Sequence, residues 1–300
     1  MRMHPPASQI VKTAVSAAIA LAMFASNANA VVVTTVPATS TGVTAMADAV
    51  LASNSGISIV ANTVKIQGTN SAAIQQYGTY SNFNLAPKTG TTPTLTMADG
   101  VVLTSGKAVV PLTNTSPNFS TTTGSGANAQ LSALSGSVTN DANTLGFDFT
   151  VESGVSSVSA KFVFGTEEFP DQAVTDIFGF FIDGVNYAKF SNGSLISNAV
   201  GSNNFISNVA GAYGIEYDGL TNVLTVTGLL NQALLTHTLM FGVADTSDSV
   251  YDSAVYLNSL TAGLSGVGGL SSDVPEPSTV FLLGIALAGG ALARRKQSSK

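Results

Sequence analysis

Two groups of acidic residues are the side chains in this sequence with the clearest capacity for chemistry. Each follows an apolar run: Glu167, Glu168, Asp171 and Asp176 form the first group, and Asp245, Asp248 and Asp252 form the second. Carboxylate oxygens on loops are ligands that Ca²⁺ prefers. The sequence therefore predicts a calcium site, which the two groups would share if their loops meet at one end of the fold. The alternative is that these carboxylates are solvated or cap turns, since neither group has EF-hand spacing.

Carbohydrate hydrolysis is a second chemistry that paired carboxylates support. A glycosidase holds its two carboxyl groups about 5 to 10 Å apart across the sugar. Glu167 and Glu168 are adjacent, so on a strand they would point to opposite faces. A pair such as Glu167 with Asp245 remains open, but no motif supports it. We therefore predict no catalytic residues and no enzymatic activity.

The other nucleophiles and bases are sparse. The chain has no cysteine, and its serines lack a G-x-S-x-G context. After residue 30 the one histidine is His237, which alternates with Leu235, Leu239 and Phe241. That pattern favours a packed, hydrogen-bonded histidine over a catalytic one.

The charge distribution argues against nucleic-acid binding. Between Val31 and Val274 the chain has five lysines, no arginine and sixteen acidic residues, a net charge of −11. Phosphate backbones are bound by Lys and Arg, which displace counterions. Divalent cations are the more natural counterions for such a surface.

The first 30 residues have the layout of a secretory signal peptide. Arg2 and Lys12 precede an apolar stretch over 14–25, and Ala28 and Ala30 occupy the −3 and −1 positions of a cut after residue 30. We expect export through the Sec translocon and removal of residues 1–30 by signal peptidase. A buried N-terminal helix would not require this order of features.

The C-terminal segment, residues 274–300, has three parts in order. A Pro-Glu-Pro triplet precedes an apolar run over 280–293, which predicts a hydrophobic anchor helix, and a basic cluster follows; the triplet is Pro275, Glu276 and Pro277, and the cluster begins with Arg294 and Arg295. The arginines are expected to stay cytoplasmic. These residues resemble the PEP-CTERM sorting signal.

The resemblance implies processing by an exosortase-type transpeptidase in a Gram-negative bacterium. It implies a transient tether in the inner membrane and then transfer to the outer surface or extracellular matrix. The alternative is a single-pass anchor that is never cut. The same module is also labelled as the C-terminal part of ice-binding proteins, but Thr-rich pieces such as 121–123 lack the regular Thr-x-Thr ladder of an ice-binding face.

The elements that must position the acidic groups are short strands joined by turn signals. Leu145, Phe147 and Phe149 alternate with polar neighbours, which predicts a strand with one buried face. Residues 177–182 are apolar throughout, as in a strand covered on both faces. Asp183-Gly184 follows directly and predicts a hairpin.

The other segments complete the expected organisation. We predict one helix over 44–52, capped by Thr44, a long loop over 116–137, and a Gly/Ser stalk over 262–273. Residues 31–261 are predicted to form an all-β ectodomain of the β-sandwich or jelly-roll type, with that short N-terminal helix.

Five sequence landmarks run in order through this ectodomain. They are GVVLTSG at 100–106, FVFGTEEFP at 162–170, DIFGFF at 176–181, VAD at 243–245 and YDSAV at 251–255. These landmarks resemble the choice-of-anchor L domain. The resemblance implies a surface domain that occurs with varied anchors, and it implies no activity.

The functional prediction is a non-enzymatic protein of the cell surface or extracellular matrix. It would act in adhesion or in association with exopolysaccharide in a biofilm. A carbohydrate-binding module is the alternative, which an exposed aromatic platform formed by Tyr77, Tyr80, Tyr213 or Tyr217 would favour; the lack of Trp counts against it. A secreted hydrolase is the second alternative and requires a cleft that joins the two acidic groups.

Overall fold

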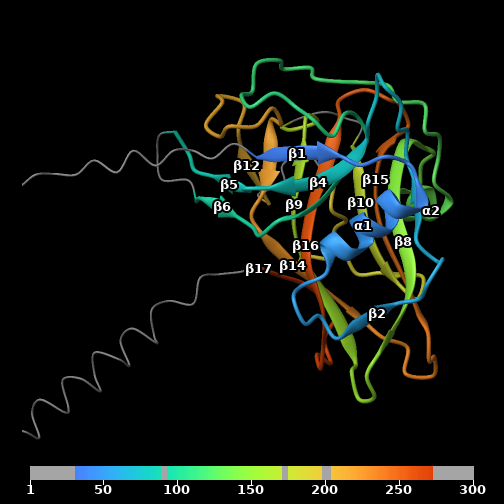
Figure 1. The fold of residues 1–300 in the computed structure, drawn as a ribbon. Coiled ribbons are helices and arrows are strands. Elements are labelled where there is room, and N and C mark those ends of the chain that lie inside the picture. Colours follow the sequence, from blue (N-terminus) through green and yellow to red (C-terminus); the bar gives the residue numbers. More distant parts are fainter. Residues whose placement is uncertain (1–30, 89–92, 171–174, 198–203, 273–300) are drawn as a thin grey trace, which may run out of the picture.

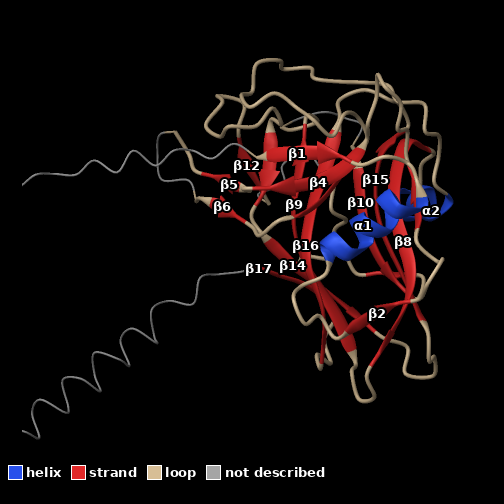
Figure 2. Ribbon diagram, viewed as in Figure 1, coloured by secondary structure: helices blue, strands red, loops and turns tan. Residues whose placement is uncertain are grey.

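The chain folds as two antiparallel β-sheets packed face to face (Figures 1 and 2). The computed structural model describes residues 31–88, 93–170, 175–197 and 204–272. Strands dominate this part of the chain, and two short helices accompany them. The all-β sandwich predicted from the sequence is confirmed.

The larger sheet has nine strands. Its centre is formed by β7 (Gly100–Thr104), β16 (Ser253–Gly263) and β9 (Ser157–Thr166). Beyond β7 lie β4 (Tyr77–Ser81) and the edge strand β1 (Val32–Thr35), and beyond β9 lie β13 (Gly219–Thr221) and β12 (Phe205–Ser207). Next to β13, β14 (Leu224–Leu229) also pairs with β9, and β17 (Gly269–Ser272) pairs with β14.

The smaller sheet has six strands. Its order is β11 (Val185–Asn186), β10 (Ile177–Ile182), β15 (His237–Thr246), β8 (Thr139–Val151) and β2 (Ile57–Ile59), and β3 (Lys65–Gln67) also pairs with β8. The remaining strands, β5 (Asn84–Leu85) and β6 (Leu95–Thr96), form a separate ribbon.

Aromatic residues fill the space between the two sheets. Phe162 and Phe178 face each other with ring centroids 4.9 Å apart, and Phe180 stacks on Phe241 at 5.0 Å. The alternation along β8 places Leu145 in this core, and every residue of β10 is buried, as their sequences predict. The predicted Asp183-Gly184 turn connects β10 to β11, and both residues have positive φ angles of 50° and 81°.

The two helices differ from the sequence prediction. Helix α1 (Ser40–Val50) begins at Ser40 rather than Thr44, because the Thr39 side chain caps it by accepting from the Gly42 amide. Helix α2 (Ala129–Ser135) lies inside the stretch predicted as loop. Asn128 caps its first turn, and Gly136 ends it at φ 75°.

The predicted Gly/Ser stalk over 262–273 is wrong at both ends, since β16 continues to Gly263 and another strand begins at Gly269. Gly269–Ser272 forms β17, which pairs with β14 from Gly269 opposite Thr227 to Ser272 opposite Leu224. The larger sheet therefore continues to the last described residue. Backbone hydrogen bonding to β14 overrides the flexibility that the local composition suggests.

Candidate functional site

The strand register brings the two predicted acidic groups to one end of the sandwich. Ile177 pairs with Ala244, so Asp176 lies beside Asp245 in the smaller sheet. In the larger sheet Thr166 pairs with Ser253, and the Glu167 amide donates to the Asp252 carbonyl at 3.1 Å. The residues that directly follow β9 and directly precede β10 therefore meet the connection between β15 and β16, as the shared-site prediction requires.

Six carboxylates at this end are removed from solvent. We call them the acidic cluster: Asp141, Glu167, Glu168, Asp176, Asp245 and Asp252. None of them is more than 2% exposed. Asp245 lies in β15 and Asp176 directly precedes β10 of the smaller sheet, whereas Glu167 directly follows β9 and Asp252 directly precedes β16 of the larger one, so the cluster joins the ends of the two layers.

Most oxygens of the cluster have no hydrogen bond. Neither carboxylate oxygen of Glu167, Asp176 or Asp245 has a partner of normal geometry among the described residues. Asp252 accepts through Oδ1 from the Thr121 amide at 2.9 Å, whereas its Oδ2 has no partner. Buried carboxylates are normally hydrogen-bonded or paired with a cation, so this end of the molecule is unusual.

Burial and mutual repulsion disfavour the charged state of the central pair. Burial raises the pKa of Asp245 to about 9; a hydrogen bond of poor geometry from the Ser105 hydroxyl lowers it, and the charges of Asp252 and Asp141 raise it. The pKa of Asp176 also lies well above its usual range, first because of burial and then because of the neighbouring Asp245. Two adjacent carboxylates in a low dielectric cannot both carry a charge without compensation.

The flanking members are shifted in the same direction. Burial raises the pKa of Glu167 to about 9, and the nearby Asp218 adds to the rise. Burial also raises the pKa of Glu168 to about 8. The pKa of Asp252 reaches about 7, again through burial, although the Thr121 amide and Lys107 both favour its charged form.

The walls of the cluster are fixed by backbone and amide contacts. The Gln76 Nε2 atom donates to the carbonyls of Thr104, Ser105 and Asp141 at 3.1, 3.1 and 2.9 Å, which ties the end of β7 to β8. Gly106 leaves room for Asp252, since a Cβ atom at Gly106 would lie 1.7 Å from the Asp252 Oδ2 atom. The glycine is therefore a packing requirement of the cluster.

Asp141 is a member of the cluster that the sequence analysis missed. It has a φ of 48° within β8, where the pairing with β15 shifts register between Val243 and Asp245. Its carboxylate accepts from the amides of Thr123 and Gly124 at 3.0 and 2.6 Å. A polar Asn-Asp pair that interrupts an alternating strand was the available signal.

The remaining predicted ligands lie elsewhere or outside the described residues. Asp248 is half-buried on the loop after β15, and its charge raises the pKa of Asp245 and Glu168. Asp171 lies outside the described residues. Within the described ranges, no three acidic or histidine side chains are already arranged around one point as a metal site.

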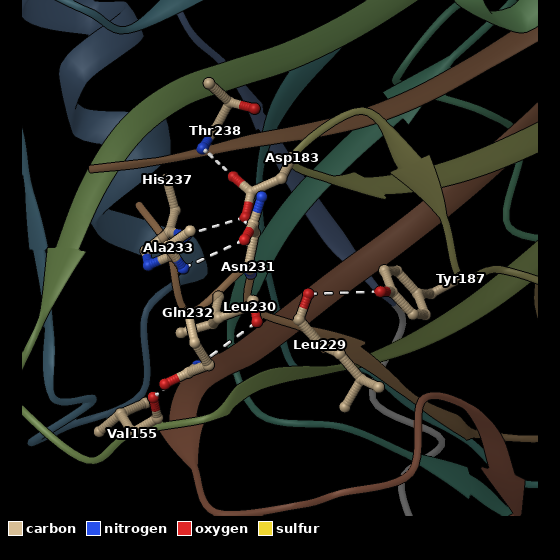
Figure 3. A network of polar contacts seen from close by, with 10 residues as sticks. All are labelled: Val155, Asp183, Tyr187, Leu229, Leu230, Asn231, Gln232, Ala233, His237 and Thr238. Carbon is tan, nitrogen blue, oxygen red and sulfur yellow. Dashed lines mark hydrogen bonds and ion pairs between the residues drawn. The ribbon is translucent and has the colours of Figure 1, made fainter. Parts of the chain in front are cut away.

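His237 belongs to a structural network at the opposite end of β15 (Figure 3). Its Nδ1 atom lies 2.8 Å from the Asp183 Oδ2 atom, and its ring packs on Phe149 with centroids 5.5 Å apart. His237 is 4% exposed, as expected for a packed histidine, whereas Leu235, which the alternation placed beside it, is 93% exposed because β15 begins only at His237.

The tyrosines considered for a sugar-binding platform are buried. Tyr77, Tyr80, Tyr213 and Tyr217 are each 2% exposed or less. Tyr80, Tyr213 and Tyr217 pack in a second hydrophobic core, and Tyr77 packs in the main core with Leu103 and Leu145. The aromatic platform that would favour a carbohydrate-binding module is therefore not formed by these residues.

The β-sandwich is followed directly by the C-terminal segment that resembles a sorting signal. This combination is typical of a β domain that is directed to the cell surface. The model of the choice-of-anchor L domain matches residues 32–261, so the chain belongs to this family. The PEP-CTERM protein-sorting motif matches residues 273–296, which makes the chain an exosortase-sorted, cell-surface protein. No curated protein and no solved structure gives a significant match.

The targeting segments lie beyond the structure. The predicted signal peptide, the sorting residues and the predicted anchor helix are outside the described residues. Among the helices of the described part, none is long and apolar enough to cross a membrane.

Proposed function

We propose that this protein is a non-enzymatic component of the cell surface or extracellular matrix, which acts in adhesion or in retention of exopolysaccharide. The observation that carries the proposal is the continuity between fold and anchor. The larger sheet continues to Ser272 in β17, and the sorting motif begins at residue 273. The whole family domain is thus held immediately beside the sorting segment.

The burial of the acidic cluster argues against a hydrolase. A glycosidase needs both carboxyl groups in contact with the sugar. Glu167 and Asp245 are at most 1% exposed, so a polysaccharide cannot reach the pair that the sequence left open. This burial favours a structural role for the carboxylates.

A deletion strain tests the proposed function. We expect loss of the chain to reduce cell aggregation, surface attachment and matrix-bound exopolysaccharide, and the full-length chain to restore them. A chain in which Pro275, Glu276 and Pro277 are replaced by alanine should be produced but fail to restore them. Normal aggregation and matrix in the deletion strain would contradict the proposal.

A second assay tests the absence of enzymatic activity. The purified protein should release no reducing ends from the strain's own exopolysaccharide. Release that is lost in a Glu167→Gln variant would instead support the hydrolase.

A further inference from the structure

We propose that the acidic cluster binds one calcium ion, with Asp176, Asp245 and Asp252 as ligands and Glu167 at its side. The ion would join the two sheets at this end of the sandwich, because Asp176 and Asp245 come from the smaller sheet and Asp252 precedes β16 of the larger one.

The unpartnered oxygens are the first argument. Asp176 and Asp245 each contribute two oxygens without a hydrogen-bond partner, and Asp252 contributes Oδ2. All three residues are 0% exposed, so bulk water does not replace the missing partners. A calcium ion takes about 6 to 8 oxygen ligands, and these carboxylates supply most of such a set.

The local charge balance is the second argument. The strand register places these carboxylates close together: Asp176 directly precedes the Ile177–Ala244 pair and Asp245 directly follows it, and the Asp252 carbonyl accepts from the Glu167 amide at 3.1 Å. Lys107 is the cation that acts on Asp252. A buried carboxylate without compensation is strongly disfavoured, and a divalent cation compensates two of them at once.

The chemistry of the donor set selects the ion. The cluster offers carboxylates and no thiolate or imidazole, since the chain has no cysteine and His237 lies at the other end of β15. Hard oxygen donors favour Ca²⁺ and Mg²⁺ over zinc or copper. Mg²⁺ demands near-ideal octahedral geometry and holds its water, whereas Ca²⁺ accepts irregular sets of carboxylates, so this dry cluster favours Ca²⁺.

The ion has to draw the ligands together. No three acidic side chains in the described ranges are already closed around a point, so binding requires side-chain rotations at the strand ends. Asp176 and Asp252 each adjoin a loop, at the starts of β10 and β16, where such rotations disturb few strand hydrogen bonds. We therefore expect calcium to bring the side chains of Asp176, Asp245 and Asp252 together on binding, because they do not form a complete site beforehand.

Calorimetric titration with CaCl₂ tests the proposal on the full exported chain, purified in mild detergent. We expect one site with a dissociation constant of about 10⁻⁴ to 10⁻³ M, the range of extracellular calcium modules. Relative to chelator, calcium at about 100 times that constant should raise the melting temperature by about 5 °C or more. Asp245→Asn and Asp176→Asn should lose both effects, and the exposed Asp48→Asn should keep both.

The rival explanation is that Asp176 and Asp245 share a proton and bind no metal. In that case the wild-type protein gives no heat with CaCl₂ up to about 10 mM, a concentration well above the expected constant, and its melts in calcium and chelator superimpose. Either result overturns the proposal, as does calcium binding that persists in the Asp176→Asn/Asp245→Asn double variant. The wild-type measurements decide the matter even if a variant fails to fold.

Discussion

The carboxylates at the two ends of β10 and β15 differ in their hydrogen bonding. At one end Asp183 follows β10 and is fully partnered: it accepts from the amides of Asn231 and Thr238 and pairs with His237 (Figure 3). At the other end Asp176 precedes β10 and Asp245 lies near the end of β15, and their oxygens have no hydrogen-bond partner. The same two strands thus have a hydrogen-bonded carboxylate at one end and carboxylates without hydrogen bonds at the other.

The two ends differ in whether the chain itself supplies the hydrogen-bond partners that the carboxylates need. The chain provides the hydrogen-bond partners of Asp183, so that end of the fold requires no bound ion. Asp176 and Asp245 are completely buried, and the hydroxyls of Ser253 and Ser105 beside them do not reach their oxygens with normal hydrogen-bond geometry. Folded proteins rarely leave buried carboxylates without a hydrogen bond or a counterion. We therefore expect the counterion of Asp176 and Asp245 to come from outside the chain, as the proposed calcium ion does.

Removal of the Asp183 hydrogen bonds should have the largest effect on the free energy of unfolding. Asp183→Ala removes the acceptor of two amides and the partner of His237, and we expect it to lower the free energy of unfolding by about 3 kcal/mol, with or without calcium. Urea denaturation measures this loss. Asp183→Asn is the matched control, because asparagine tolerates the φ of 50° and keeps one acceptor, so it should cost clearly less.

The acidic end should make the protein sensitive to alkaline pH when calcium is removed. The pKa of Asp245 is about 9 in the folded state and near 4 when unfolded, so its contribution to stability is complete below pH 4 and is lost as pH rises to about 9. The slope is about 1.4 kcal/mol per pH unit for each proton that the fold retains.

Urea denaturation in chelator between pH 5 and 9 measures this slope. The groups that face Asp245 are Asp176, Asp252, Asp141 and Asp248, with Ser105 as a hydroxyl neighbour. Asp245→Asn should reduce the slope in chelator without abolishing it, because Glu167, Glu168 and Asp252 also have raised pKa values. A wild-type curve that is already flat would show that the folded state does not hold these protons.

A side chain added beside the acidic cluster should weaken calcium binding more than it destabilises the fold. The Cβ atom in Gly106→Ala would displace the Asp252 carboxylate, so we expect the calcium dissociation constant to rise by about tenfold, which corresponds to about 1.4 kcal/mol. Gly266→Ala is the control, since a Cβ atom there meets nothing within 4 Å. Equal constants for the two variants would remove Asp252 from the ion site.

A partnered carboxylate near the cluster should give the smallest effect. Glu216 is buried but accepts from the Thr115 and Ser116 amides, so the chain already satisfies it. We expect Glu216→Gln to cost about 1 kcal/mol of stability and to leave the calcium affinity unchanged within about twofold. A large loss of calcium affinity would mean that the ion site extends to Glu216.

The sequence predicted strands better than it predicted their ends. Period-two alternation identified β8, and the apolar run identified β10, because burial on one or both faces leaves a direct trace in residue type. Helix α2 was missed, although Asn128 and Gly136 are typical caps, because the surrounding Ser, Thr and Gly residues dominate the local composition. Likewise β17 depends on β14, a partner distant in the chain.

The candidate site was predictable in its membership but not in its environment. Glu167, Asp176, Asp245 and Asp252 were identified from their positions next to strands. Their burial could not be read from the sequence, since acidic residues after a strand are usually solvated. Only the pairing of β9 with β16 and of β10 with β15 brings these four residues to one end of the sandwich.

The position of β17 gives the tether a mechanical property. Tension applied through the sorting segment reaches Ser272 before any other described residue, and Gly269–Ser272 is a short strand that pairs with β14 alone. Its release would free residues 266–272, which span about 24 Å when extended, while Ser265 stays hydrogen-bonded to Ser156 and Ser157 and β14 stays paired with β9. Under tension the chain would therefore extend by the release of β17 before the two sheets of the sandwich begin to separate.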